Sequence, residues 1–164
     1  MLQLAAGGQP GFLVDDRELR RSGPSFTVDT LHSLRAELGT VPLCLILGMD
    51  AFRSLAGWHC WQVIPQLAHL VVTRRPGSPW PTSGPVAALL REHGSEDPNV
   101  LRRSPSGRVL LVSITQLGVS ASAIRERVAA GLSARYLLPD AVDDYIHRHG
   151  LYRSRVEPQS AELP

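Results

Sequence analysis

The chain has 164 residues, of which 43% are hydrophobic and 20% are charged, and its formal net charge is +2. This length suits one domain with a buried core, and the composition excludes the disordered and fibrous classes. The small net charge excludes a broad electrostatic surface for nucleic acid. No apolar run is long enough to cross a membrane, and the start of the chain has no signal-peptide pattern. The two cysteines have neither metal-type nor disulfide spacing, which favours a reducing cytoplasm.

Strand-like and helix-like patterns alternate along the chain. In chain order they predict the end of a helix at 1–6, a short strand at 12–14, a helix at 27–38, a strand at 42–47, a short helix at 51–55, a helical turn at 64–68, a strand at 69–73, a helix at 86–93, a strand at 108–114, and helices at 120–130 and 140–149. The polar residues 153–164 are predicted to form a disordered tail.

The run Pro42-Leu-Cys-Leu-Ile-Leu47 is continuously apolar, which is typical of a strand buried on both faces. Cys44 inside this run is expected to be a small core residue. Alternation of strands and helices around such a strand predicts an α/β domain with a largely parallel sheet. In sheets of this kind, ligands bind at the carboxyl ends of the strands.

Two motifs follow directly after predicted strands. Gly48-Met-Asp50 follows the first of these strands, and Arg74-Arg75-Pro-Gly follows the next. Gly48 can let a ligand approach the backbone. Asp50 can accept hydrogen bonds from ribose hydroxyls, or it can cap a helix. Arg75 can bind an anion, or it can be a solvated residue at the end of a strand.

A third motif is the start of the helix that begins near Ser120. Ser120 is placed as its N-cap, Ser122 adds a second hydroxyl in the first turn, and Arg125 and Arg127 follow early in the same helix. Cations are unfavourable near a helix N-terminus unless an anion binds there, so the pattern predicts a phosphate site. The alternative is an ordinary capped surface helix whose arginines are solvated or paired with Glu126.

Several motifs occur together in a fixed order. They are Pro24-Ser-Phe-Thr27, Gly48-Met-Asp50, Trp58-His59, the segment 69–77, the segment 119–125 and the segment 137–152. From about Met1 to Tyr152 this ordered set resembles the bacterial nicotinate-nucleotide adenylyltransferases. The resemblance implies a Rossmann-like nucleotidyltransferase fold in 1–152 and a cytoplasmic enzyme. Its activity would be to join ATP, with Mg²⁺, to nicotinate mononucleotide, forming deamido-NAD and pyrophosphate. Membrane and nucleic-acid partners are not expected, and a homo-oligomer is left open.

The resemblance also assigns roles to residues of this chain. It places the ATP site at Gly48, Asp50, Ser120, Ser122 and Arg125. It places the nicotinate ring and its carboxylate at Thr27, Trp58 and His59, and the phosphate of the nicotinate nucleotide near Arg75. Without the resemblance, Trp58 is equally well read as a partly buried packing residue.

One part of the family pattern has no counterpart in this sequence. Family members begin with a strand, a Gly-Gly-Thr-Phe-Asp-Pro-like loop and a His-x-Gly-His motif, but none of the six histidines here stands in such a motif. No catalytic residue is therefore assigned. Two N-terminal strands, including the central one, are expected to be missing, so the strand that begins near Leu43 is expected to expose an apolar edge that favours aggregation. The chain corresponds to the C-terminal two thirds of the enzyme, through truncation or a late start codon. On its own, such a chain is expected to be poorly stable and catalytically silent.

Two other functions stay open. One is a nucleotidyltransferase of the same fold with another acceptor, such as phosphopantetheine, against which Thr27 and the Trp58-His59 pair argue. The other is a non-catalytic nucleotide-binding remnant.

Overall fold

The computed structural model describes residues 1–74, 79–115 and 118–153. The chain forms two compact units, one of residues 16–116 and one that combines residues 1–15 with residues from 117 onward. The predicted tail, 153–164, lies outside the described residues except for Arg153. Among the described residues, no helix is both long enough and apolar enough to span a membrane.

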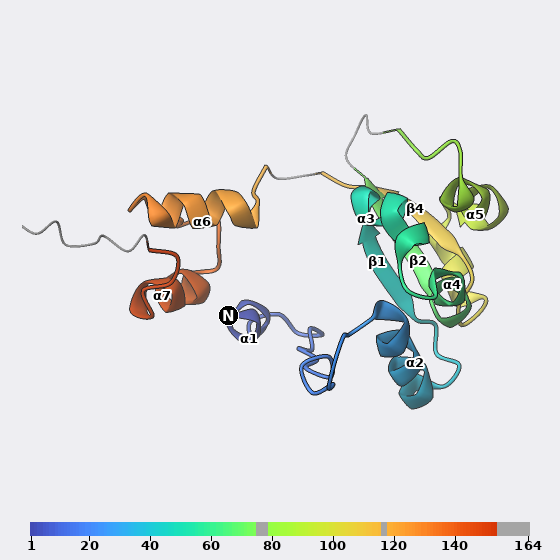
Figure 1. Ribbon diagram of the computed structural model, residues 1–164, viewed down its shortest axis with the longest axis horizontal. Helices are drawn as coiled ribbons and strands as arrows, with labels where there is room; N and C mark the ends of the chain where they lie inside the picture. Colours follow the sequence, from blue (N-terminus) through green and yellow to red (C-terminus); the bar gives the residue numbers. More distant parts are fainter. Residues whose placement is uncertain (75–78, 116–117, 154–164) are drawn as a thin grey trace, which may run out of the picture. The chain divides into compact units, whose positions relative to one another are not determined.

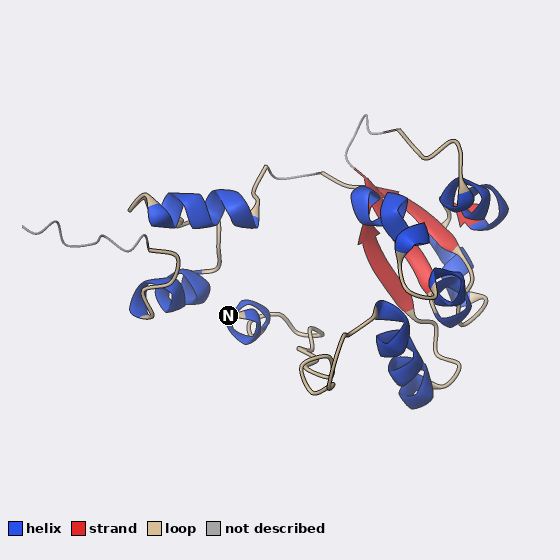
Figure 2. Cartoon of the chain, viewed as in Figure 1, coloured by secondary structure: helices blue, strands red, loops and turns tan. Residues whose placement is uncertain are grey.

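The unit 16–116 is built on a four-stranded sheet in which every pair of neighbouring strands is parallel (Figure 2). Its strands are β1 (Cys44–Gly48), β2 (His69–Arg74), β3 (Gly94–Ser95) and β4 (Val109–Ser113), in the spatial order β1-β2-β4-β3. The predicted α/β class with a parallel sheet is confirmed. The two-residue β3 was not predicted, because it is too short to show a periodic pattern.

One helix precedes the first strand of this unit, and further helices and 3₁₀ turns connect the strands (Figure 1). The helices are α2 (Thr27–Leu38), α3 (Met49–Ser54), α4 (Ile64–Leu67) and α5 (Pro85–His93), with 3₁₀ turns η1 (Leu55–Gly57), η2 (Trp61–Val63) and η3 (Pro98–Arg102). The helix predicted at 27–38 has those bounds, and it ends where Gly39 takes a positive φ of 59°. The helices predicted at 64–68 and 86–93 are confirmed to within one residue at each end.

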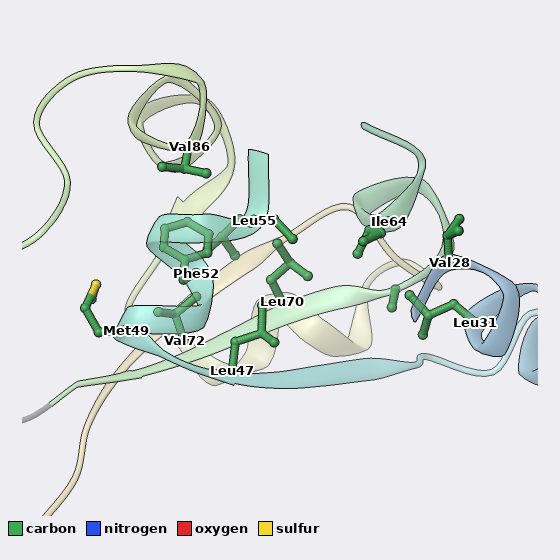
Figure 3. Close-up of a cluster of buried hydrophobic side chains, with 12 residues drawn as sticks. Val28, Leu31, Leu47, Met49, Phe52, Leu55, Ile64, Leu70, Val72 and Val86 are labelled. Carbon is green, nitrogen blue, oxygen red and sulfur yellow. The ribbon is translucent and has the colours of Figure 1, made fainter. Parts of the chain in front are cut away.

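The hydrophobic core of this unit lies on one face of the sheet. Leu47, Leu70 and Val72 point from neighbouring strands toward Phe52 and Leu55, which come from the segment after β1 (Figure 3). Phe52, Leu55, Leu70 and Val72 have no exposed surface at all. Packing of this kind fixes the turn that follows β1, and therefore the backbone that leads to Trp58.

The other face of β1 is open to solvent, which contradicts the prediction that this strand is buried on both faces. The side chain of Ile46 is 70% exposed, and Cys44 is exposed as well, so it is not a core residue. A continuous apolar run is the expected pattern for a central strand, whereas among the described residues β1 lies at an end of the strand order and pairs only with β2. An apolar edge of this kind favours association between chains.

We expect that Ile46→Lys lowers aggregation while changing the free energy of unfolding by less than about 0.5 kcal/mol, because an exposed lysine blocks edge pairing without entering the core. Light scattering at rising protein concentration measures the first effect, and urea unfolding measures the second. The matched control is Leu47→Lys on the adjacent residue, which is 6% exposed and should unfold the protein by burying an unpaired charge. Equal aggregation of Ile46→Lys and wild type would contradict the prediction.

Two polar side chains stabilise the connecting segments of this unit through hydrogen bonds to the backbone. Arg35 in α2 donates hydrogen bonds to four backbone carbonyls, those of Gly39 (2.8 Å), Val41 (2.7 Å), Leu67 (3.1 Å from Nε) and Pro105 (3.0 Å). One guanidinium therefore ties the end of its own helix to the end of α4 and to the loop before β4.

The second is His69, which is completely buried. Its Nδ1 accepts a hydrogen bond from the amide of Arg108 (3.0 Å), so Nε2 carries the proton and donates to the carbonyl of Ser104 (2.8 Å). The imidazole thus holds the loop that leads into β4.

The other unit contains three helices, α1 (Leu2–Ala6), α6 (Ala121–Ala129) and α7 (Asp140–Arg148). All three were predicted. A small core joins α6 and α7 and consists of Ile124, Val128, Ala134, Val142 and Ile146. The strand predicted at 12–14 is wrong: this segment has no strand structure, and Phe12 and Leu13 are 71% and 96% exposed. Three apolar residues without a pairing partner do not form a strand.

Candidate functional site

The carboxyl ends of β1, β2 and β4 meet at one edge of the sheet. Gly48 is in register with Thr73, and Arg74 is in register with Ser113. A Cβ atom added at Gly48 would meet no atom within 4 Å, so the backbone there is open to an approaching group. This is the edge at which ligands bind in open α/β sheets.

Asp50 lies just beyond this edge, in the first turn of α3. It is exposed, and within the described ranges its carboxylate makes neither a hydrogen bond nor an ion pair. The N-cap of α3 is Gly48, and no side chain caps this helix. The alternative interpretation of Asp50 as a helix cap is therefore wrong, and its carboxylate remains available to a ligand.

A pocket of about 270 Å³ lies between the start of α2 and the turn after η1. We call this cavity the aromatic pocket. Its lining residues are Ser25, Phe26, Thr27, Gly57, Trp58 and His59. The structure thus brings together Thr27, Trp58 and His59, although about thirty residues of chain separate Thr27 from the other two. A pocket with aromatic walls suits a planar ring.

The turn that carries Trp58 and His59 is held by its own backbone. The amide of Trp58 donates to the carbonyl of Leu55 (2.9 Å), and the amide of Trp61 donates to the carbonyl of Trp58 (3.2 Å). Leu55 is fully buried, so the core anchors this turn. Cys60 completes the turn with a positive φ of 48°, and its Sγ lies 3.5 Å from Nε2 of His59.

The first turn of α2, where Thr27 lines the aromatic pocket, begins with backbone amides that have no hydrogen-bond partner among the described residues. The carbonyl of Phe26 accepts hydrogen bonds from the amides of Asp29 (3.0 Å) and Thr30 (3.3 Å). The amides of Thr27 and Val28 have no partner among the hydrogen bonds of the described residues. Free amides and the helix dipole both favour an anion, so this pocket suits a planar ring that carries a carboxylate.

Phe26 lines the aromatic pocket as well, although the sequence motifs did not predict a site role for it. Its ring centroid lies 4.3 Å from that of His59, with 30° between the ring planes. A role for Phe26 could have been suspected from its position directly before a helix, where a small polar residue is usual and a large aromatic one is not.

The other unit contains the second predicted group of site residues, at the start of α6. Ser120 is the N-cap, and its hydroxyl accepts a hydrogen bond from the amide of Ala123 (3.1 Å). Nη2 of Arg125 donates to the hydroxyl of Ser122 (3.2 Å), so the guanidinium turns back toward the helix N-terminus. Ser120, Ser122 and Arg125 therefore share one helix end, and the arrangement offers an anion both charge and hydrogen-bond donors.

Arg127 does not belong to this group. Its Nε and Nη2 donate to the carbonyl of Ser133, at 3.2 and 3.0 Å, so it closes the other end of α6. The expectation that both arginines serve an anion is wrong for Arg127. A helix can direct residues two positions apart to different sides.

Two further features bear on the predicted site. Arg75 lies outside the described residues, while its neighbour Arg74 lies with its guanidinium carbon 4.7 Å from the ring centre of Trp80. Within the described ranges, no three histidine, cysteine, aspartate or glutamate side chains are grouped so that they could hold a metal ion.

Comparison with known proteins identifies the family. No protein-family model matches the chain. A probable nicotinate-nucleotide adenylyltransferase of Aeromonas salmonicida is 47% identical over 156 residues, which are 94% of this chain and 72% of the relative. Proteins of the same description from Hahella chejuensis and Methylococcus capsulatus are 46% and 44% identical, each over 93% of this chain and over 70% and 73% of their own lengths.

Solved structures agree on the fold. The nicotinic acid mononucleotide adenylyltransferase of Plasmodium falciparum, solved with APC and with NaAD, matches with a TM-score of 0.57 at 17% identity. The match covers 86% of this chain and spans 64% and 62% of the two solved chains, so it supports the Rossmann-like nucleotidyltransferase fold. With the identity to the bacterial relatives, it follows that this chain belongs to the nicotinate-nucleotide adenylyltransferases, a family of nucleotidyltransferase enzymes.

Proposed function

We propose that the function of this protein is the transfer of the adenylyl group of ATP to nicotinate mononucleotide, forming deamido-NAD and pyrophosphate in the biosynthesis of NAD. This chain supplies nucleotide-binding residues for the reaction, whereas the family's His-x-Gly-His motif has no counterpart in its sequence. The observation that carries the proposal is the aromatic pocket at the N-terminus of α2. It combines walls for a planar ring, from Trp58 and His59, with the backbone amide of Thr27, which has no partner among the described residues, for a carboxylate. The solved Plasmodium enzyme that shares the fold was found with NaAD, which contains a nicotinate ring.

The ATP half of the site is assigned to two groups of residues. Ser122 and Arg125 at the start of α6, with the Ser120 cap that shapes it, would bind the phosphates. Gly48 and Asp50 at the sheet edge would face the adenosine, with the free carboxylate of Asp50 accepting hydrogen bonds from ribose hydroxyls. We assign Arg75 to the phosphate of the nicotinate nucleotide on the strength of the family motif alone.

The reaction needs no nucleophile from the protein. A phosphate oxygen of nicotinate mononucleotide attacks the α-phosphorus of ATP, the bond from this phosphorus to the bridging oxygen breaks, and pyrophosphate leaves with that oxygen. The protein's part is to hold the two substrates in line and to neutralise charge, for which Arg125 is suited. Mg²⁺ would arrive on the ATP phosphates and supply further neutralisation of charge.

Fluorescence titration tests the nicotinate half without requiring turnover. Trp58 should be quenched when a pyridine ring stacks against it, so nicotinate mononucleotide should give a saturable decrease in tryptophan emission. Nicotinamide mononucleotide lacks the carboxylate that the amides of α2 would bind, and it should bind more weakly. Release of pyrophosphate from ATP and nicotinate mononucleotide then separates an active enzyme from a non-catalytic binding protein.

We expect that Trp58→Ala raises the dissociation constant for nicotinate mononucleotide by roughly 2- to 12-fold, since a stacked ring contributes about 0.5–1.5 kcal/mol beyond area burial. The affinity for ATP should not change. Calorimetric titration with each nucleotide measures both values. An equal loss of affinity for both nucleotides would mean that Trp58 only packs the fold, and the nicotinate assignment would fall.

A further inference from the structure

Phe26 occupies a position where its residue type is unfavourable. It is the N-cap of α2, the place where serine, threonine, aspartate or asparagine stabilises a helix, and it makes no side-chain cap. Its φ of −107° and ψ of 145° are ordinary extended values that any residue adopts. Its side chain is 40% exposed and belongs to neither of the two buried clusters formed by the described residues. Phe26 therefore supports neither the helix nor the core, and a broken local rule of this kind points to function.

The contacts of Phe26 show what the ring does. Its centroid lies 4.3 Å from the imidazole of His59. Within the described residues, the imidazole's one further ring or hydrogen-bond contact is with the thiol of Cys60, 3.5 Å from Nε2. His59 is exposed, so little else restrains its side chain. The orientation of the imidazole at the aromatic pocket depends on Phe26.

We propose that Phe26 is a positioning residue for the pyridine ring of the substrate, an inference that rests on the proposed function. It holds the imidazole of His59 in place before the substrate binds. The pyridine ring that binds beside Trp58 therefore contacts an imidazole that is already oriented. Ordering the wall in the free protein removes an entropic cost from binding. Phe26 affects the binding of nicotinate mononucleotide in this way, and ATP binding does not depend on it.

Phe26→Ser separates this role from a structural one, because the two properties should change in opposite directions. Serine is a better N-cap than phenylalanine, so the melting temperature should stay the same or rise by a few degrees. The dissociation constant for nicotinate mononucleotide, from tryptophan quenching, should rise roughly 3- to 10-fold, within the range of aromatic pair contacts. Phe26→Tyr keeps the ring and should bind within about twofold of wild type. A purely structural Phe26 would give lower stability and unchanged affinity per folded molecule.

A double-mutant cycle with His59→Ala checks that Phe26 acts through the imidazole. In the His59→Ala background, Phe26→Ser should weaken binding by less than twofold. If the effects of the two substitutions simply multiply, Phe26 does not act through His59, and the inference is wrong. If wild type binds and Phe26→Ser binds equally well, the inference alone is wrong. If wild type gives no saturable response to nicotinate mononucleotide, the proposed function is wrong and the inference with it.

Discussion

Replacing Arg125 with alanine is expected to weaken ATP binding by roughly 10- to 150-fold, equivalent to the 1.5–3 kcal/mol of a charge-assisted hydrogen bond. The guanidinium is directed back to the hydroxyl of Ser122, 3.2 Å away, and so lies where the helix dipole alone would repel a cation. An arginine held there gains most when a phosphate binds beside it. Calorimetric titration with ATP and Mg²⁺ measures the loss.

Arg127 provides the matched control for this prediction. It is on the same helix, two residues away, but its guanidinium is bound to the carbonyl of Ser133. Arg127→Ala should leave ATP affinity within about twofold of wild type and lower only the stability of the unit that contains α6. If both variants bind ATP as wild type does, Arg125 is a surface residue and the phosphate site lies elsewhere.

The proposed nicotinate-binding and phosphate-binding residues both lie at the N-terminus of a helix. α2 and α6 each begin with two amides that have no partner among the described residues: those of Thr27 and Val28 in α2, and those of Ala121 and Ser122 in α6. What surrounds each helix end then determines which anion it suits. Aromatic side chains beside α2 suit a ring carboxylate, whereas a hydroxyl and a guanidinium beside α6 suit a polyphosphate.

The sequence predicted those features that depend on local patterns. Apolar spacing and Gly39 set the bounds of α2, and the Ser120 cap set the start of α6. Both signals involve residues within a few positions of each other, where propensity and capping are reliable. The motif order located Thr27, Trp58 and His59, which the structure brings together in one pocket.

Features that depend on distant partners could not be predicted in this way. The apolar run around Ile46 is the pattern of a central strand. The expectation of an exposed apolar edge came from the family resemblance, and it agrees with the strand order of the described residues, in which β1 has one neighbour. No sequence pattern singled out Arg35, yet its hydrogen bonds reach Leu67 and Pro105. The partners of a long polar side chain are set by the tertiary arrangement, which periodicity does not encode.

His69 was similarly read only as the first residue of a strand, and it carries the largest expected effect on stability. We expect that His69→Ala lowers the free energy of unfolding by about 3–5 kcal/mol. Removing the fully buried ring leaves a cavity and takes the partners from the amide of Arg108 and the carbonyl of Ser104. Because domains are stable by only about 5–15 kcal/mol, most of the margin would be lost.

Three further variants identify the cause of that loss. Asn at position 69 can still accept from Arg108, and Gln can still donate to Ser104, so His69→Asn and His69→Gln should each recover part of the stability. His69→Leu refills the cavity but satisfies neither backbone group, and it should remain destabilised by about 2 kcal/mol or more. Urea unfolding followed by tryptophan emission measures all four variants, since Trp58, Trp61 and Trp80 lie in the same unit as His69. A leucine variant as stable as wild type would show that packing, and not the two hydrogen bonds, is what His69 contributes.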